Sequence, residues 1–225
     1  MILALAVALV APLTLVVVLV NDARTKALLL LLSWGALSGV AAAYTNTWLL
    51  SALDIPLLEL KVEFAPLVEE FLKALPLFFL LVFTGRYVED RTVILGAIFA
   101  GLGFSIVENY SYMIESARTL GPNELLRYVL LRSFSTTIMH ALATGIIGLG
   151  LFSIRRGTFE PFGFSNTFVF VAYSFAVLLH ALFNLLVQFQ TLGRTAAIGT
   201  VVVLYLGAYV FFDTIYTNLA TEHPG

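Results

Sequence analysis

Charged side chains inside the apolar segments are the residues of this sequence that can do chemistry. The run PLVEEFLKALPLFFLLVFT holds Glu69, Glu70 and Lys73. Glu69 and Lys73 are four residues apart and share a helix face, so the ammonium can neutralise one carboxylate and leave the other as a base. Intramembrane charges usually face a protein interior or a wet cavity and mark a functional site. The alternative is an interfacial salt bridge where the helix enters lipid.

A further carboxylate lies in GLGFSIVENYSYM. There Phe104, Glu108 and Tyr112 follow one another at four-residue spacing, which places them on one helix face, and Asn109 sits beside the carboxylate. Glu108 lies about two turns inside its apolar segment, so it is not a surface charge. It is either functional or a buried partner of a Tyr or Asn side chain.

Two histidines occupy the next two apolar segments. TTIMHALATG has His140 near the middle, with Thr144 one turn further on the same face, and LLHALFNLL has His180 and Asn184 at the same spacing. A single membrane histidine can simply tie two helices together. Two of them in neighbouring segments, beside embedded glutamates, predict one shared site.

Such a cluster supports two hydrolytic mechanisms, neither of which needs a Ser or Cys nucleophile. In the first, Glu69 or Glu70 is the general base for a water held by Glu108 or a histidine, and His180 and Asn184 donate to the oxyanion.

In the second mechanism, His140, His180 and Glu108 hold a zinc ion that activates the water. We favour the metal-free mechanism, because a Glu–Glu pair beside Lys73 suits a base better than a ligand, and keep zinc as the alternative. The same residues would also serve a proton- or metal-coupled transporter.

The composition identifies the class of protein. Of 225 residues, 60% are hydrophobic and 12% are charged, and the mean hydropathy is +0.97. Soluble domains carry roughly 25% charged residues, so we predict a multi-pass protein of the cell membrane. The net charge of −2 gives no indication of a nucleic-acid partner, and the absence of cysteine excludes disulfides and thiolate chemistry.

The apolar segments predict an all-α, polytopic membrane helix bundle in a single domain, 1–225. A span needs about 20 apolar residues, and about seven segments qualify. We expect spans one and two (within 1–50) to be accessory, spans three to six (within 60–190) to form the catalytic core, and 195–217 to be the final span. We read the apolar N-terminus as a retained span, because it has no basic n-region and no cleavage site. The predicted spans are 2–20, 27–49, 64–84, 93–115, 128–152, 167–190 and 195–217.

The distribution of Lys and Arg between the short loops predicts the orientation. The odd-numbered loops hold more of them than the even-numbered loops, which favours an outside N-terminus and a cytoplasmic C-terminus. Helical rise then places Glu108 about 10 Å, His180 roughly 15 Å and His140 roughly 18 Å below the outer ends of their spans. All the embedded carboxylates and imidazoles therefore fall in the outer half of the bilayer. Arg132 and Asp213, near span ends, are read as local pairs or snorkelling side chains.

The motifs also resemble those of a known family. EEFLK (69–73), FSIVENYSY (104–112), His140 and the H-x-x-x-N of His180 and Asn184 are similar to the PrsW-type intramembrane proteases, relatives of the CAAX-type prenyl endopeptidases. The resemblance implies an intramembrane endopeptidase that cuts membrane-anchored, anti-sigma-factor-like single-span proteins on the extracytoplasmic side. From the CAAX-type pattern, catalytic roles transfer to Glu69, His180 and Asn184 more directly than to Glu108.

Two other classes stay open on the sequence alone. A transporter should show an inverted repeat and matching helix breaks, and Pro76 has no counterpart in a second half. An inert scaffold should have lost part of the Glu/His set, which this chain retains.

Overall fold

The computed structural model describes residues 2–84, 90–155 and 165–188, together with six residues between 199 and 210. All the elements in these ranges are helices, as predicted. They are α1 (Ile2–Leu19), α2 (Ala23–Leu53), α3 (Leu57–Glu59), a five-residue π-helix η1 (Leu60–Phe64), α4 (Ala65–Thr84), α5 (Asp90–Ser116), α6 (Pro122–Arg155) and α7 (Ser165–Gln188).

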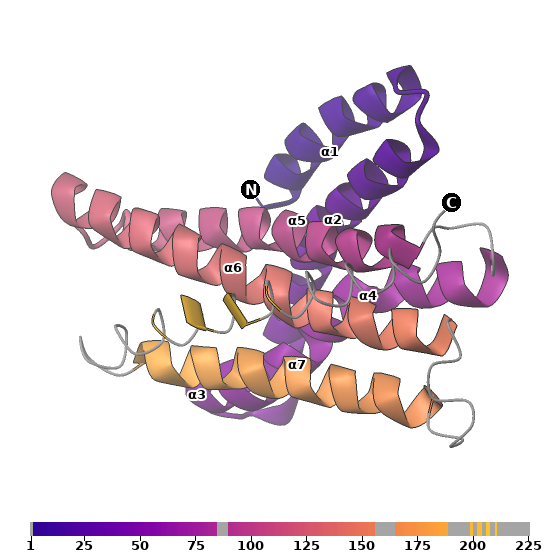
Figure 1. Cartoon of the computed structure of the whole chain (residues 1–225). Helices are drawn as coiled ribbons and strands as arrows, with labels where there is room; N and C mark the ends of the chain where they lie inside the picture. The colour runs from indigo at the N-terminus through magenta and orange to yellow at the C-terminus, as the bar shows by residue number, and fades with distance from the viewer. Residues whose placement is uncertain are drawn as a thin grey trace.

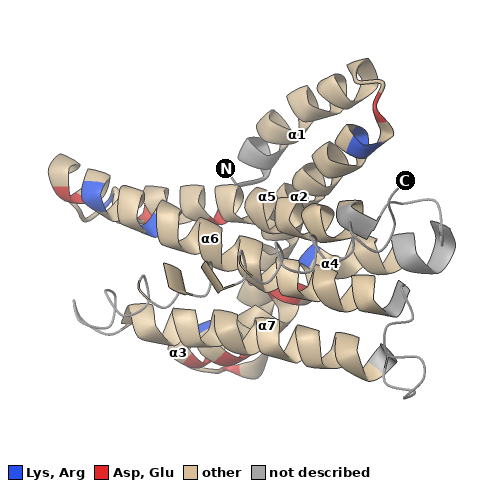
Figure 2. Cartoon of the chain, viewed as in Figure 1, with Lys and Arg blue, Asp and Glu red and all other residues tan. Residues whose placement is uncertain are grey.

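Helices α5 and α6 pack together at the centre, with α2 against α5 and α7 against α6 (Figure 1). Helix α4 contacts α2, α5, α6 and α7, so it lies among the elements that carry the ionisable residues. The N-terminal helix α1 pairs with α2 as a hairpin at the edge of the molecule. Charged side chains are sparse along the helices and gather at turns and helix ends, with a small group near α4 (Figure 2).

Four described helices are long and apolar enough to cross a bilayer, and they correspond to predicted spans two, four, five and six. Helix α1 lies at predicted span one, and α4 lies at predicted span three but carries three charges. The predicted span 195–217 falls outside the described residues except for single positions. The chain is thus a multi-pass membrane protein, and the number seven stays a prediction.

Local chemistry explains where α2 begins and ends. The Asp22 carboxylate accepts the backbone N–H of Thr25 at 2.7 Å, which caps the first turn. At the other end Asp54 adopts a left-handed conformation, with φ of 51°, and Pro56 follows two residues later. Both features stop a helix, and they turn the chain into the short segment that leads to α4.

Small residues let α5 approach both of its neighbours. A side chain at Gly35 would overlap the backbone of Ala100, and one at Gly103 would overlap the backbone of Leu32. On the opposite side of α5, a side chain at Gly101 would overlap the backbone carbonyl of His140 in α6. Close backbone approach of this kind is typical of membrane helix interfaces. Gly101 therefore controls how near α5 comes to a histidine of the predicted site.

Candidate active site

Helix α4 presents its three charges to the interior of the bundle. Glu70 and Lys73 are completely buried, and Glu69 is 7% exposed. An interfacial salt bridge in contact with water and headgroups would not be buried in this way. The burial of these three side chains therefore does not fit the interfacial salt bridge that the sequence left open.

Glu70 is held by hydrogen bonds from three helices. Its Oε1 accepts from Lys73 Nζ at 2.6 Å and lies 2.8 Å from Nδ1 of His180, while Oε2 accepts from Thr144 Oγ1 at 3.1 Å. A buried carboxylate needs an opposite charge and donors to be stable, and Glu70 has both. Since both of its oxygens are engaged, Glu70 is the structural centre of the cluster.

The partners of His140 define its tautomer. Nδ1 lies 2.8 Å from Lys73 Nζ, and Nε2 lies 3.0 Å from Oε2 of Glu108. Because an ammonium only donates and a carboxylate only accepts, we assign a neutral ring with its hydrogen on Nε2. Phe104, 2% exposed, covers the Lys73 ammonium at 4.3 Å and packs on the His140 ring, with a centroid separation of 4.9 Å.

Glu108 is the most exposed carboxylate of the cluster. Its carboxylate side chain is 18% exposed, and Oε1 lies 3.6 Å from an Arg132 nitrogen. The Arg132 guanidinium stacks on the ring of Tyr112 at 3.3 Å. Arg132 thus belongs to the cluster, although from the sequence we read it as a local pair or a snorkelling side chain near a span end. The feature of the sequence that could have indicated this is spacing. One face of α6 carries, at every fourth residue, Arg132, Thr136, His140 and Thr144.

Glu69 is the less engaged carboxylate of the pair. Its Oε1 accepts from Asn46 Nδ2 of α2 at 3.0 Å. Its Oε2 lies 3.6 Å from Nε2 of His180, beyond hydrogen-bond distance. Both of these atoms are buried, and neither has a hydrogen-bond partner within the described ranges. Because Nδ1 of His180 faces the carboxylate of Glu70, its hydrogen is assigned there, and Nε2 presents a lone pair toward Glu69.

Sequence analysis missed Asn46. It lies in the polar stretch YTNTW near the end of α2, far along the chain from any embedded carboxylate. An asparagine near the end of a span has no pattern that distinguishes it from an interfacial residue, so only the packing of α2 against α4 reveals its role.

Two prolines in the site segment leave backbone carbonyls without their helical partners. Pro76 has no N–H for the carbonyl of Leu72, four residues earlier, and the indole N–H of Trp34 donates to that oxygen at 2.8 Å. In η1 the bonding runs five residues apart, from Ala65 N–H to the Leu60 carbonyl.

The next bond in that pattern would link Pro66 to the carbonyl of Lys61, and proline lacks the donor. Asn184 Nδ2 donates to the Lys61 carbonyl instead, at 2.9 Å. The structure therefore places Asn184, predicted to act in catalysis, with one amide hydrogen on the backbone. Asn109, predicted as a supporting residue, donates to Thr137 Oγ1 at 3.3 Å.

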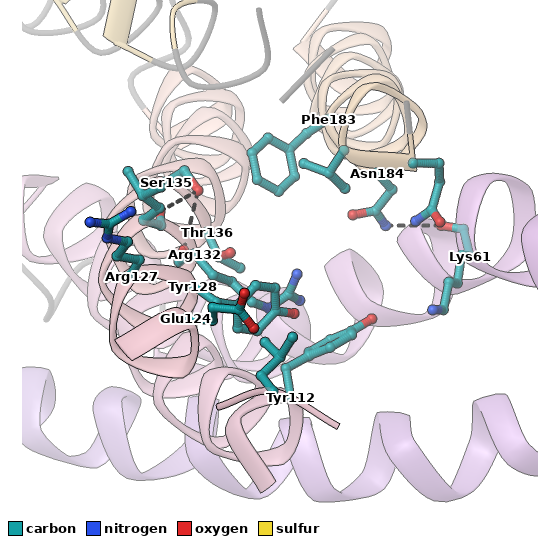
Figure 3. Close-up of a pocket in the computed structure, with 14 residues that line it drawn as sticks. Lys61, Tyr112, Glu124, Arg127, Tyr128, Arg132, Ser135, Thr136, Phe183 and Asn184 are labelled. Atoms are coloured by element: carbon teal, nitrogen blue, oxygen red, sulfur yellow. Dashed lines mark hydrogen bonds between the residues drawn. The ribbon is translucent and has the colours of Figure 1, made fainter. Parts of the chain in front are cut away.

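A pocket of about 500 Å³ adjoins the cluster (Figure 3). Its wall includes Asn184, one turn after His180, and Thr136, one turn before His140, together with Arg132 beside Glu108. Figure 3 shows Asn184 and Lys61 on one side of the pocket and the α6 residues on the other, with Tyr112 between them. The volume suits a ligand or a short stretch of peptide.

Glu69, His140 and His180 are the residues in the described ranges that could hold a metal ion. One donor atom from each lies within 4.8 Å of the others. One carboxylate and two imidazoles match a catalytic zinc site in kind, and the unpartnered donor atoms of Glu69 and His180 support the fit. We predicted Glu108 in this set from the sequence, whereas the structure puts Glu69 there and places Glu108 against Nε2 of His140.

The helical bundle and its buried carboxylate–imidazole cluster define a polytopic membrane protein with an embedded ionisable site. A family model described as PrsW family intramembrane metalloprotease matches residues 23–212. The chain belongs to this family and is a membrane protease, as its motifs predicted. Neither the curated proteins nor the solved structures gave a match.

Proposed function

We propose that this chain is an endopeptidase that cuts single-span membrane proteins with a water activated by Glu69, in the extracytoplasmic half of the bilayer. The observation that carries the proposal is the pair of unpartnered buried atoms, Glu69 Oε2 and His180 Nε2, facing each other at 3.6 Å. A single water oxygen reaches both atoms at hydrogen-bond distance, because its two hydrogens can be donated one to each.

The remaining groups position this pair. Asn46 fixes the other oxygen of Glu69, and Glu70 fixes the tautomer of His180 through Nδ1. Glu69 takes a proton from the water as the oxygen attacks the peptide carbonyl, and returns the proton to the leaving amine. In the neutral ring His180 accepts the second water hydrogen, so it orients the water and does not donate to the oxyanion. We assign the oxyanion contact to the second amide hydrogen of Asn184.

A zinc ion would be held by Glu69, His140 and His180, and would polarise a bound water. Two features support the metal-free mechanism. Both ring nitrogens of His140 are already engaged, by Lys73 and Glu108, and a metal ligand must offer a lone pair. The Lys73 ammonium, 2.8 Å from Nδ1 of His140, also repels a second cation placed beside that ring.

The test is cleavage of a panel of single-span substrates in liposomes by purified wild type and Glu69→Gln. Removal of a general base should reduce turnover by about 10²- to 10⁴-fold. The control is Glu63→Gln, an exposed glutamate in η1, which should cut like wild type. Each protein is assayed with and without a chelator, and its zinc content is measured by mass spectrometry.

The outcomes separate the mechanisms. Cleavage that survives the chelator, in protein without stoichiometric zinc, supports the glutamate mechanism. If the wild type contains stoichiometric zinc, and activity is lost when the zinc is removed and returns when it is restored, the reaction uses a metal site. A folded wild type that cuts nothing across the panel, or a fully active Glu69→Gln, would overturn the proposal.

A further inference from the structure

The pocket beside the cluster has an unequal charge balance. Its lining residues include three cationic side chains, Lys61, Arg127 and Arg132, against one carboxylate, Glu124. Arg132 also lies 3.6 Å from Glu108, so Lys61 and Arg127 supply the excess positive charge. We propose that this pocket binds an acidic side chain of the substrate, a few residues from the bond that is cut, and so selects substrates with a Glu or Asp there. This inference rests on the proposed function and extends it to substrate choice.

Two side chains that line the pocket have buried polar atoms without a hydrogen-bond partner among the described residues. Thr136 is 1% exposed, lines the pocket, and its hydroxyl has no hydrogen-bond partner among the described residues. The Nε of Arg132 is likewise buried and unpartnered in this part of the chain. Buried donors are costly when unpaired, so they indicate a missing acceptor. A carboxylate supplies two acceptor oxygens and the charge that complements Arg and Lys.

The position of the pocket determines which part of the substrate it meets. Thr136 and Asn184 are each one helical turn, about 5.4 Å, from His140 and His180 respectively. A side chain held there therefore belongs to a residue close to the scissile bond. Lys61 and Arg127 stand at opposite walls, and Lys61 Nζ lies 5.6 Å above the Tyr112 ring. This continuity with the catalytic cluster favours a substrate residue over a lipid headgroup as the occupant.

The experiment measures binding, so that it does not depend on turnover. The Glu69→Gln protein in nanodiscs of neutral lipid is titrated with three single-span peptides that differ at one juxtamembrane position, which is Glu, Gln or Lys. The position is scanned over the residues next to the span. One charge-assisted hydrogen bond should favour the Glu peptide over the Gln peptide by about tenfold at the best position.

Two further proteins carry Lys61→Gln with Arg127→Gln, or Lys26→Gln with Arg118→Gln, in the same background. The first pair removes pocket cations, and the second removes the same charge at positions that do not line the pocket. We expect the preference for the Glu peptide to vanish in the first and persist in the second. Unfolding temperatures of all the proteins, followed by circular dichroism, identify any variant that has not folded.

Three results would overturn the inference: equal binding of the three peptides at every position, a preference that survives loss of Lys61 and Arg127, or one that the control pair also abolishes. Equal peptide binding, combined with retention of phosphatidylglycerol that depends on Lys61 and Arg127, would assign the pocket to lipid. The proposed function is tested separately, by asking whether the wild type cleaves the Gln peptide. Absence of cleavage there would count against the proposed function alone, because peptide binding to Glu69→Gln does not require catalysis.

Discussion

Two adjacent glutamates occupy different environments at the residue scale. Glu70 is completely buried with donors on both oxygens, whereas Glu69 has Asn46 on one oxygen and an unpartnered second oxygen near His180. A carboxylate with saturated oxygens holds its neighbours in place, and one with an unpaired oxygen can take a proton. We therefore assign the base to Glu69 and the positioning role to Glu70.

Asn46 is a positioning residue for Glu69, and its removal tests that assignment. In Asn46→Ala the carboxylate of Glu69 loses the hydrogen bond from the Asn46 amide and rotates more freely. Turnover should fall by about 10- to 100-fold, with little change in KM, because hydrogen bonds to charged groups contribute about 1.5–3 kcal/mol. Steady-state cleavage kinetics measure both constants.

The matched control is Asn123→Ala, which removes an exposed asparagine from the first turn of α6. It should leave both constants unchanged. A raised KM with normal turnover in Asn46→Ala would instead place Asn46 in substrate binding, and two unchanged constants would remove its role altogether.

The sequence predicted the Glu69–Glu70 pair but not which member is the base. The distinction depends on Asn46, Thr144 and His180, and these partners come from three other helices, up to 110 residues away along the chain. Helical periodicity reports which residues share a face of one helix. It carries no information about which oxygen of a carboxylate meets a donor from another helix.

At the scale of the element, α4 stays helical through Pro76 because a neighbouring helix replaces the missing donor. The sequence shows that Pro76 interrupts the hydrogen bonding of this span, but not that Trp34 of α2 supplies a bond to the Leu72 carbonyl. Lys61 and Asn184 form the equivalent contact at η1. The segment that carries Glu69, Glu70 and Lys73 is thus fixed from α2 on one side and α7 on the other.

Removing the Trp34 donor should destabilise the fold in a way that depends on Pro76. Trp34→Phe leaves the Leu72 carbonyl unpaired, at a cost of about 1–3 kcal/mol. In a Pro76→Ala background the new backbone N–H can donate to that carbonyl, so the same substitution should cost less. Unfolding in detergent micelles, followed by circular dichroism, gives the four free energies of the cycle.

Trp48→Phe is the control for loss of an indole, since Trp48 is 64% exposed on the same helix. It should shift the unfolding midpoint little. Additive effects of Trp34→Phe and Pro76→Ala would contradict the proposed exchange of donors.

At the scale of the whole molecule, composition and hydropathy were enough to predict a helical membrane bundle. Gly35 and Gly39 of α2 lie against α5. The sequence did not define the role of α4 as a helix surrounded by others, because apolarity alone does not distinguish a lipid-facing side from a side packed on another helix. The charges of α4 indicated more clearly than its apolar residues that it packs among other helices.

Orientation in the membrane can be tested directly, because the chain has no cysteine and a single introduced one is unique. Loop charges predict that residue 117 faces outside and residue 23 faces the cytoplasm. A membrane-impermeant maleimide should label Ala117→Cys in intact cells and Ala23→Cys only after permeabilisation. Both positions are exposed: Ala23 is the first residue of α2, and Ala117 lies in the turn after α5. The reverse pattern would put the active site in the cytoplasmic half of the bilayer.

The side-chain contacts that replace the missing N–H donors of two prolines also have an evolutionary consequence. A proline at position 76 leaves the Leu72 carbonyl in need of a donor such as Trp34, and the Trp34 hydrogen bond contributes less once residue 76 regains an N–H. Positions 66 and 184 constrain each other in the same way through the Lys61 carbonyl. We expect each pair to be gained and lost together among members of the family, so that divergence at one position predicts the residue type at the other.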